Sequence, residues 1–311
     1  MKTLPISVVI PAFNAEATLE RALQSVLSQA HSVSEIIVVD DGSTDSTRVV
    51  AERHGAAIRY VSQENRGVSV ARNRGIAEAN EEWIAFLDAD DEWLPGKLEE
   101  QVRRLHEDLE VKWICSNMEI AGNDGGTRLQ MPRRFQSLAD AGSPIPFFPS
   151  LRSGVQFQTS GFIIHSSVFR EVGTFDPKLR VCQDRDLWWR IALKHPLVGY
   201  VPIAGHRYYV NISGSLTKGC PCRDAELMNV CDRVEAAREC DPKNAGNLEL
   251  HAKDVAWTYL IRAKADLVSL TRFSWDLAFR TFNFDWHQRA CLRLIDVLPP
   301  STAKVLARRL T

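Results

Sequence analysis

The sequence predicts an α/β fold with a mostly parallel central sheet, flanked by helices and followed by a helical C-terminal extension. Short, uninterrupted apolar runs alternate with segments of helical spacing over the first 120 residues, which is typical of a parallel sheet covered on both faces. Regular structure resumes after an irregular segment at 121–160, and the pattern is helical from about residue 223. A length of 311 residues fits one large domain or two smaller ones.

Strands and helices are expected to alternate in the first half of the chain. The apolar runs predict strands at 6–10, 35–39, 57–61, 83–87 and 111–115. Helices are predicted between them, over about 19–27, 43–54 and 67–79 and from Pro95 onward. In the first of these, Leu19, Leu23 and Val26 recur on one helical face.

The second half of the chain is expected to add fewer strands. GFIIH (161–165) and LVGYV (197–201) predict strands on either side of a helix over about 184–194. The segment 121–160 is rich in Gly and Pro, and loops of this length are usually functional lids or mobile segments. We expect three parts, at 1–120, 121–220 and 221–311, of which the last is a helical extension.

Composition and charge exclude several classes of protein. With 45% hydrophobic and 25% charged residues the chain is an ordinary globular one, and 38 Lys and Arg against 39 Asp and Glu argue against a nucleic-acid binder. No apolar run is long enough to span a membrane, and Pro5 and Pro11 interrupt the only N-terminal apolar stretch. Seven cysteines without C-x-x-C spacing indicate reduced thiols, so we expect a cytoplasmic protein.

The last 61 residues carry an excess of positive charge. Residues 251–311 contain ten Lys or Arg, five Asp and no Glu. Three interpretations stay open for these helices: a solvated cationic face, a peripheral contact with the inner face of the membrane, and a homodimer interface.

An acidic run directly follows the predicted strand at 83–87. Asp88, Ala89, Asp90 and Asp91 place three carboxylates within four residues. A hard divalent cation, Mg²⁺ or Mn²⁺, would relieve their mutual repulsion, since it prefers oxygen ligands and often takes one or two carboxylates together with phosphate oxygens. The alternative is an acidic turn that caps the next helix. Because ligands of parallel α/β sheets bind at the carboxyl ends of the strands, this position favours function.

Polar or aromatic residues follow two other strands in the same way. Asp40 and Asp41 end the strand at 35–39, where a carboxylate can accept a base or ribose donor or cap the following helix. Phe13 follows the first strand and could stack on a nucleobase or pack in the core. Arg72 offers a planar donor to a base or a phosphate.

The order of these motifs resembles a known family. ISVVIPAFNAEATLERALQSVLSQ, EIIVVDDGSTDST, NRGVSVARNRGI and WIAFLDADDEW together resemble the family 2 inverting glycosyltransferases, whose catalytic domain has the Rossmann-like GT-A fold. The resemblance runs from residue 4 to about 115, returns at GTFDPKLRVCQDRDLWWRIA and fades after about 217.

The resemblance implies roles for individual residues. Positions that hold the nucleobase and ribose of the donor are matched within the segment Pro11-Ala12-Phe13-Asn14, by Asp41 with its neighbour Asp40, and by Arg72. Asp88 and Asp90, on either side of Ala89, match the D-x-D pair that handles the metal-bound diphosphate, with Asp90 the direct ligand and Asp91 a helper. Asp184 matches the general base.

The chain departs from the family pattern at two places. Gln183 stands where the family often has Glu, while Asp184 is kept; Asp186 is the second candidate for the base, although its helical position points it away from Asp184. Asn211 stands near the place of a histidine that many members carry, and His206 lies too far upstream to match.

The resemblance implies a metal-dependent, inverting transfer of a sugar from a nucleoside-diphosphate donor to a hydroxyl. It also implies a nucleotide-sugar-binding half at 1–120 and an acceptor-side half with the catalytic base at 121–220. UDP-sugar is the expected donor, with GDP- and dTDP-sugars open. A saccharide or lipid-linked saccharide of a surface polysaccharide is the expected acceptor; the alternatives are a polyprenyl phosphate and a nucleotide-binding module without catalysis. Cys220, Cys222, Cys231 and Cys240 have poor zinc spacing, and neither G-x-G-x-x-G nor G-x-x-x-x-G-K-[ST] occurs.

Overall fold

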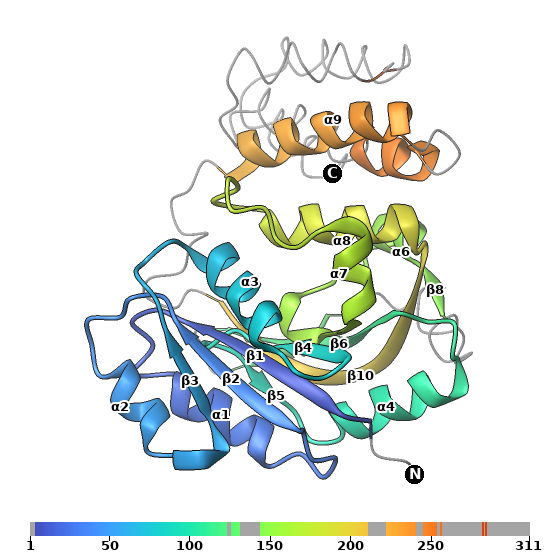
Figure 1. The fold of residues 1–311 in the computed structure, drawn as a ribbon. Helices are drawn as coiled ribbons and strands as arrows, with labels where there is room; N and C mark the ends of the chain where they lie inside the picture. Colours follow the sequence, from blue (N-terminus) through green and yellow to red (C-terminus); the bar gives the residue numbers. More distant parts are fainter. Residues whose placement is uncertain are drawn as a thin grey trace. The chain divides into compact units, whose positions relative to one another are not determined.

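The computed structural model describes residues 4–122, 126–130, 144–210, 222–240, 245–253, 256, 282 and 284 (Figure 1). The chain divides into two compact units, Met1–Ser215 and Leu216–Thr311. The first contains the sheet and every described residue of the predicted site, and the second contains helix α9 (Cys222–Cys240). The division into 1–120, 121–220 and 221–311 stays a prediction.

A central sheet forms the middle layer of the first unit. Its path runs β3-β2-β1-β4-β9-β6-β10-β5, with β7 paired to β6 and β8 to β10. The strands are β1 (Ile6–Ala12), β2 (Glu35–Asp40), β3 (Arg59–Ser62), β4 (Trp83–Phe86), β5 (Glu92–Trp93), β6 (Trp113–Ala121), β7 (Thr127–Leu129), β8 (Ile145–Pro146), β9 (Phe162–His165) and β10 (Leu197–Tyr209). The predicted α/β class with a GT-A-like sheet is confirmed.

Strand direction changes across this sheet. β3, β2, β1 and β4 are mutually parallel, and β6 is parallel to β10. Between these two groups β9 pairs antiparallel with both β4 and β6. The parallel strands need crossover helices, which explains the periodic alternation in the first half of the sequence. The carboxyl ends of β1, β2 and β4 therefore meet at one edge of the sheet.

Helices cover both faces of the sheet. They are α1 (Leu19–Leu27), α2 (Thr47–Glu52), α3 (Val68–Glu78), α4 (Lys97–Glu107), α6 (Phe147–Arg152), α7 (Ser166–Val172) and α8 (Gln183–Lys194), together with the short turns η1 (Gly55–Ala57) and η3 (Thr159–Gly161). In Figure 1, α1, α2 and α4 lie on one face, and α3, α7 and α8 lie on the other. All the helices predicted in this part are present, with ends shifted by a few residues.

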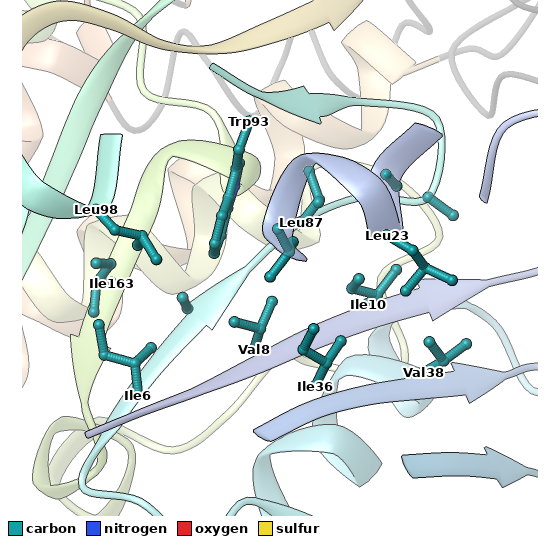
Figure 2. Close-up of a cluster of buried hydrophobic side chains, with 14 of the residues drawn as sticks. Ile6, Val8, Ile10, Leu23, Ile36, Val38, Leu87, Trp93, Leu98 and Ile163 are labelled. Carbon is teal, nitrogen blue, oxygen red and sulfur yellow. The ribbon is translucent and has the colours of Figure 1, made fainter. Parts of the chain in front are cut away.

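Side chains at alternate positions of β1 and β2 fill the core on the α1 face. Ile6, Val8 and Ile10 point to the same side as Ile36 and Val38, as period-two strands require. Figure 2 shows them beneath Leu23 of α1, with Leu87, Trp93, Leu98 and Ile163 completing the cluster. Burial of these branched side chains stabilises the sheet through removal of apolar surface from water.

The opposite face packs more closely against α3 and against aromatic rings. A Cβ on Gly75 would lie 2.2 Å from Val9 Cγ1, so only glycine lets α3 approach β1 this closely. Phe86 meets Phe175 edge to face at 5.7 Å, and Phe175 meets Trp188 at 5.9 Å. Trp188 and its neighbour Trp189 are both buried and belong to the core.

Two strands are longer than the apolar runs that predicted them. β6 continues to Ala121 and β10 to Tyr209, and their polar ends pair with each other. Arg207 lies opposite Glu119 and forms an ion pair with it at 3.0 Å. Cross-strand charge pairs stabilise such polar strand ends without any apolar signal in the sequence.

The second unit is helical at 222–240 and 245–253. Val230, Cys231 and Val234 of α9 are buried, and Arg238 forms an ion pair with Glu249 at 2.5 Å. Most of the basic segment 251–311, together with Asn211 and Cys220, lies outside the described residues. No helix in the described part of the chain is long and apolar enough to cross a membrane.

Candidate functional site

Two loops at the carboxyl edge of the sheet are joined by Asn14, which follows β1. Its backbone is left-handed, with φ 47°, a conformation that asparagine tolerates better than most residues. In that conformation Asn14 N donates to Ser43 Oγ at 2.9 Å, and Thr44 N donates to Asn14 Oδ1 at 2.9 Å. The loop after β1 is thereby fixed to the loop after β2.

The predicted residues Pro11, Ala12 and Phe13 differ in exposure. Pro11 and Ala12 are the buried last residues of β1. The next side chain, Phe13, is 51% exposed. An aromatic ring held in solvent by a fixed loop has an open face for stacking, so the structure favours the binding role of Phe13 over a role in the core.

Asp40 and Asp41 hold different loops: Asp40 holds the loop after β2, and Asp41 holds the loop after β3. Asp40 is buried, accepts from Ser43 N at 2.8 Å and accepts from the Tyr60 hydroxyl at 2.5 Å. Burial and the hydrogen bond to Asp40 raise the pKa of Tyr60 well above its ordinary value. Asp40 therefore supports the turn after β2.

Asp41 holds the segment that leads into α3. Its Oδ1 accepts from Gln63 Nε2 at 2.8 Å and from Arg66 N at 2.9 Å, and its Oδ2 accepts from Gly67 N at 2.7 Å. Asp41 N donates to Ala12 O at 2.8 Å, which joins this segment to the end of β1. A carboxylate oxygen can accept two hydrogen bonds, so Asp41 Oδ2, which accepts one here, retains capacity for a ligand.

The acidic loop, which we define as Asp88–Asp91, follows β4 at the same edge. Arg21 of α1 donates from Nη2 to Asp90 O at 2.6 Å and lies over the Tyr209 ring, with Cζ 3.9 Å from its centroid. Asp91 N donates to Asp88 O at 3.0 Å, which closes the loop into a turn. Contacts from α1 and β10 therefore fix its backbone.

The carboxylates of the acidic loop differ in their surroundings. Burial and the charge of Asp88 raise the pKa of Asp90 to about 6. Asp91 is buried, and its carboxylate accepts from Ser160 Oγ at 2.6 Å. Burial and its acidic neighbours raise the pKa of Asp91 well above its ordinary value. Asp88 and Asp90 are thus better placed than Asp91 to meet a ligand.

Arg72, on the first turn of α3, lies next to the acidic loop. Its Nη2 donates to Asp88 Oδ1 at 2.6 Å, and its Cζ lies 5.2 Å from the Phe175 ring centroid. Its Nε and Nη1 are buried and have no hydrogen-bond partner among the described residues. A buried guanidinium with unused donors is a candidate site for an oxygen-rich anion.

Asp184 lies in the first turn of α8, as predicted for the base. Its Oδ1 accepts from Arg185 N at 2.8 Å, and the side chain is partly exposed. The residue before the helix, Cys182, has φ 58°, and such left-handed backbone concentrates near functional sites. Gln183, which stands in place of the family's Glu, is buried.

The surroundings of Asp186 indicate a structural role. It is 0% exposed and forms an ion pair with Arg190 at 2.8 Å. Arg190 also donates to Val172 O at 2.5 Å and to Thr174 O at 2.7 Å, so the pair fastens the segment before α8. Of the two carboxylates, Asp184 is therefore the more accessible.

One tyrosine relates the acidic loop to Asp184. Burial raises the pKa of Tyr208, and the negative charges of the acidic loop and of Asp184 raise it further. Both the acidic loop and Asp184 are therefore near enough to Tyr208 for their charges to act on it.

The donor set suits a divalent cation only together with a ligand. In the described ranges, no three His, Cys, Asp or Glu side chains are grouped to hold a metal ion. A pair of carboxylates in which the charge of one raises the pKa of the other, as Asp88 raises that of Asp90, matches Mg²⁺ or Mn²⁺ sites completed by phosphate oxygens.

No histidine joins this site in the described part of the chain. His206 is 0% exposed, lies opposite Trp93 in the pairing of β10 with β5, and burial lowers its pKa to about 3. It is therefore a neutral core residue. Asn211 lies outside the described residues.

Several residues around the site had no signal in the sequence. Ser160 lies in the segment expected to be irregular, Arg21 reads as a polar position on α1, and Asn73 reads as the neighbour of Arg72. Asn73 exchanges two hydrogen bonds with the Phe175 backbone, at 2.7 and 2.9 Å, and so ties α3 to the segment before α8. Only spatial proximity reveals such roles.

Comparisons with known proteins agree on one family. The family described as Glycosyl transferase family 2 matches residues 7–171. An uncharacterized glycosyltransferase of Rickettsia typhi is 32% identical over 187 residues, which are 60% of this chain and 58% of that protein. The Escherichia coli protein named UDP-Glc:alpha-D-GlcNAc-diphosphoundecaprenol beta-1,3-glucosyltransferase WfgD is 36% identical over 121 residues, 38% of this chain and 47% of that protein.

A third relative and a solved structure extend the likeness. The putative teichuronic acid biosynthesis glycosyltransferase TuaG of Bacillus subtilis is 39% identical over 106 residues, 33% of this chain and 42% of that protein. The S. aureus TarS 1-349 structure in complex with UDP-GlcNAc has a TM-score of 0.68 at 16% identity and covers 89% of this chain and 79% of that one. The matched region spans 58% or less of these three curated relatives.

Proposed function

The chain belongs to glycosyl transferase family 2, and from that premise we propose that it transfers a sugar from a nucleoside-diphosphate donor to an acceptor hydroxyl. The observation that carries this proposal is that Arg72, a buried guanidinium with two donors unused among the described residues, contacts Asp88 of the acidic loop at 2.6 Å, while Asp184 is partly exposed in the first turn of α8. The reaction needs two functions in one place: a group that handles a departing diphosphate and a base for the incoming hydroxyl. The acidic loop and Asp184 are candidates for these two functions.

The proposed reaction is a single displacement at the anomeric carbon. The acceptor oxygen forms a bond to that carbon while its proton passes to the Asp184 carboxylate. The bond from the carbon to the diphosphate oxygen breaks, and the nucleoside diphosphate leaves with the electron pair. One base without a second nucleophilic carboxylate implies inversion at the anomeric carbon, by the logic that separates inverting from retaining glycosidases.

Asp90 and Asp88 are the residues that we propose would hold Mg²⁺ or Mn²⁺. Bound there, the cation would neutralise the charge that develops on the leaving diphosphate. The raised pKa of Asp90 supports this assignment, because part of its cause is the charge of Asp88, and a cation would relieve that repulsion. Asp91 is assigned to support of the loop.

Phe13, Asp41 and Arg72 are the residues that we propose would hold the nucleoside. Phe13 offers an exposed ring for stacking, Asp41 offers acceptor capacity at the end of β2, and Arg72 offers two unused donors in the described surroundings. A uridine nucleotide is the first choice of donor, because the structurally similar TarS was solved with UDP and with UDP-GlcNAc.

The acceptor is proposed to be a saccharide or a lipid-linked saccharide of a surface polysaccharide. The names of the WfgD and TuaG relatives, a diphosphoundecaprenol glucosyltransferase and a teichuronic acid biosynthesis protein, support this class. Contact with the inner face of the membrane, or dimerisation through the basic segment 251–311, would suit a lipid-linked acceptor and is proposed with it.

A thermal-shift measurement with UDP, GDP and dTDP, each with and without Mn²⁺, tests the proposal. A ligand that binds only the folded state raises stability by about 2.7 kcal/mol at a hundredfold excess over its Kd. We expect UDP to raise the unfolding midpoint in a Mn²⁺-dependent way. If none of the three nucleotides raises the unfolding midpoint, with or without Mn²⁺, the proposed activity is contradicted.

A further inference from the structure

Ser160 lies beneath the acidic loop and contacts both of its ends. It is the middle residue of η3, directly before β9, and is 0% exposed. Its Oγ accepts from Asp88 N at 3.1 Å and donates to Asp91 Oδ2 at 2.6 Å. A hydroxyl can donate one hydrogen bond and accept two, so one side chain satisfies both groups.

The turn that carries Ser160 is itself fixed from below. Ser160 O accepts from Trp93 Nε1 at 2.9 Å, and the next carbonyl, Gly161 O, accepts from Gln101 Nε2 at 2.8 Å. Gln101 Oε1 accepts from Lys97 Nζ at 2.6 Å, and this ammonium lies 4.1 Å from the centroid of the Trp93 ring. All of these side chains are buried.

Close packing leaves η3 no room to shift. A Cβ on Gly161 would lie 2.8 Å from Cys115 Sγ on β6 and 2.9 Å from His206 Cε1 on β10. Two strands and α4 therefore fix the turn, and both hydrogen bonds that the Ser160 hydroxyl forms with described residues lead to the acidic loop. Asp88 is the residue whose carboxylate meets Arg72.

We propose that Ser160 is a positioning residue, which holds the acidic loop in the conformation that presents Asp88 and Asp90 to the metal-bound diphosphate of the donor. This inference rests on the proposed function. Replacement of Ser160 by alanine would leave Asp88 N and Asp91 Oδ2 without this partner, and unsatisfied buried groups drive a local rearrangement. Nucleotide binding that depends on the metal should then weaken more than metal-independent binding.

Ser160→Ala and Ser150→Ala form a matched pair for the test. Ser150 on α6 is also 0% exposed and donates to Pro146 O at 2.6 Å, away from the acidic loop. The Kd of UDP is measured by calorimetry with and without Mn²⁺ for both variants and the unaltered chain. We expect Ser160→Ala to weaken Mn²⁺-dependent UDP binding by about tenfold, since hydrogen bonds to charged groups are the stronger ones.

The controls separate positioning from general stability. Ser150→Ala should leave the Mn²⁺ dependence unchanged, and Ser160→Thr, which keeps the hydroxyl, should restore part of it. If Ser160→Ala does not fold, Ser160→Cys, a close isostere with a weak donor, takes its place and is expected to show the same selective loss.

The outcomes distinguish the two proposals. If the unaltered chain binds UDP only with Mn²⁺, and Ser160→Ala or its substitute Ser160→Cys keeps that dependence, the positioning role is wrong while the proposed function stands. If the unaltered chain binds no nucleotide in the presence of Mn²⁺, the proposed function itself is contradicted. An equal loss in Ser160→Ala and Ser150→Ala would also overturn the positioning role.

Discussion

Arg72 meets Asp88 through a single hydrogen bond, from Nη2 to Oδ1 at 2.6 Å, which uses only part of a buried guanidinium. Its Nε and Nη1 lie in the interior with no partner in the described part of the chain. Burial of unsatisfied donors costs free energy. A ligand that supplies acceptor oxygens would recover that free energy, so binding at this pair would also stabilise the folded chain.

Replacement of Arg72 by methionine is expected to weaken nucleotide binding by at least about tenfold, because charge-assisted hydrogen bonds to the ligand are lost. The unfolding midpoint should change little, since the variant also removes two unsatisfied buried donors. Calorimetry with UDP and thermal unfolding measure the two effects. Arg48→Met, at an exposed ion pair with Glu52, is the control and should alter neither. Unchanged UDP affinity in Arg72→Met would contradict the prediction.

Asp184→Asn is expected to abolish transfer while leaving the Kd of UDP unchanged, because the amide keeps the shape of the side chain but cannot accept the acceptor proton. A sugar-transfer assay beside a UDP binding assay checks this. Asp186→Asn is the comparison: it breaks a buried ion pair and should lower the free energy of unfolding, by about 3 kcal/mol or more. Normal transfer by Asp184→Asn would refute the assignment of the base.

Phe13→Ala is expected to raise the Kd of UDP without a loss of stability, because this ring is exposed and stacking on a base contributes about 1–3 kcal/mol. Phe13→Trp should keep most of the affinity. Leu109→Ala, at a side chain that is 77% exposed, serves as the control for removal of surface apolar area. Equal UDP affinity in Phe13→Ala and the unaltered chain would rule out stacking.

Lys97→Met should change how stability depends on pH. Burial lowers the pKa of Lys97 from 10.5 to about 7 in the folded chain. Between these values the unfolded chain holds a proton that the folded chain lacks, so the stability contribution of Lys97 is lost as pH falls toward 7 and returns as pH rises. In urea unfolding from pH 7 to 10, the free energy of unfolding of the unaltered chain should rise relative to that of Lys97→Met, by at most about 5 kcal/mol. Parallel pH profiles would contradict this.

Gly75→Ala is expected to destabilise the fold by about 1–3 kcal/mol, because the new methyl would overlap Val9 in the contact between α3 and β1. Val9→Ala in the same chain opens space and should recover part of that loss. Denaturant unfolding of the two single variants and the double variant measures the coupling. Additive losses would show that the helix moves away instead of pressing on Val9.

The parallel half of the fold could be predicted because its signals are local. The apolar runs that became β1, β2 and β4, with helical spacing between them, report burial on both faces of a sheet. Polar strand ends carry no such signal, so Arg207 and Glu119, which stabilise each other across β10 and β6, lay beyond the predicted strands.

The candidate site likewise contains residues that the sequence could reveal and residues that it could not. Asp88, Asp90 and Asp184 could be picked out because carboxylates at element ends stand out in a sequence. Their supports could not: Ser160 and Asn73 act through backbone groups distant in the sequence, and such contacts depend on tertiary packing. The exposure that separates Asp184 from Asp186 likewise follows from how α8 packs, as does the ion pair with Arg190.

The antiparallel insertion of β9 between β4 and β6 sets an order of events during synthesis on the ribosome. β4 emerges early, yet one of its edges stays open until Phe162–His165 has been translated. An open strand edge is a template for wrong pairing with other chains. The same short stretch that closes this edge brings Ser160 beneath the acidic loop. Closure of the open β4 edge and support of the acidic loop in the nascent chain therefore depend on the same short stretch, residues 159–165.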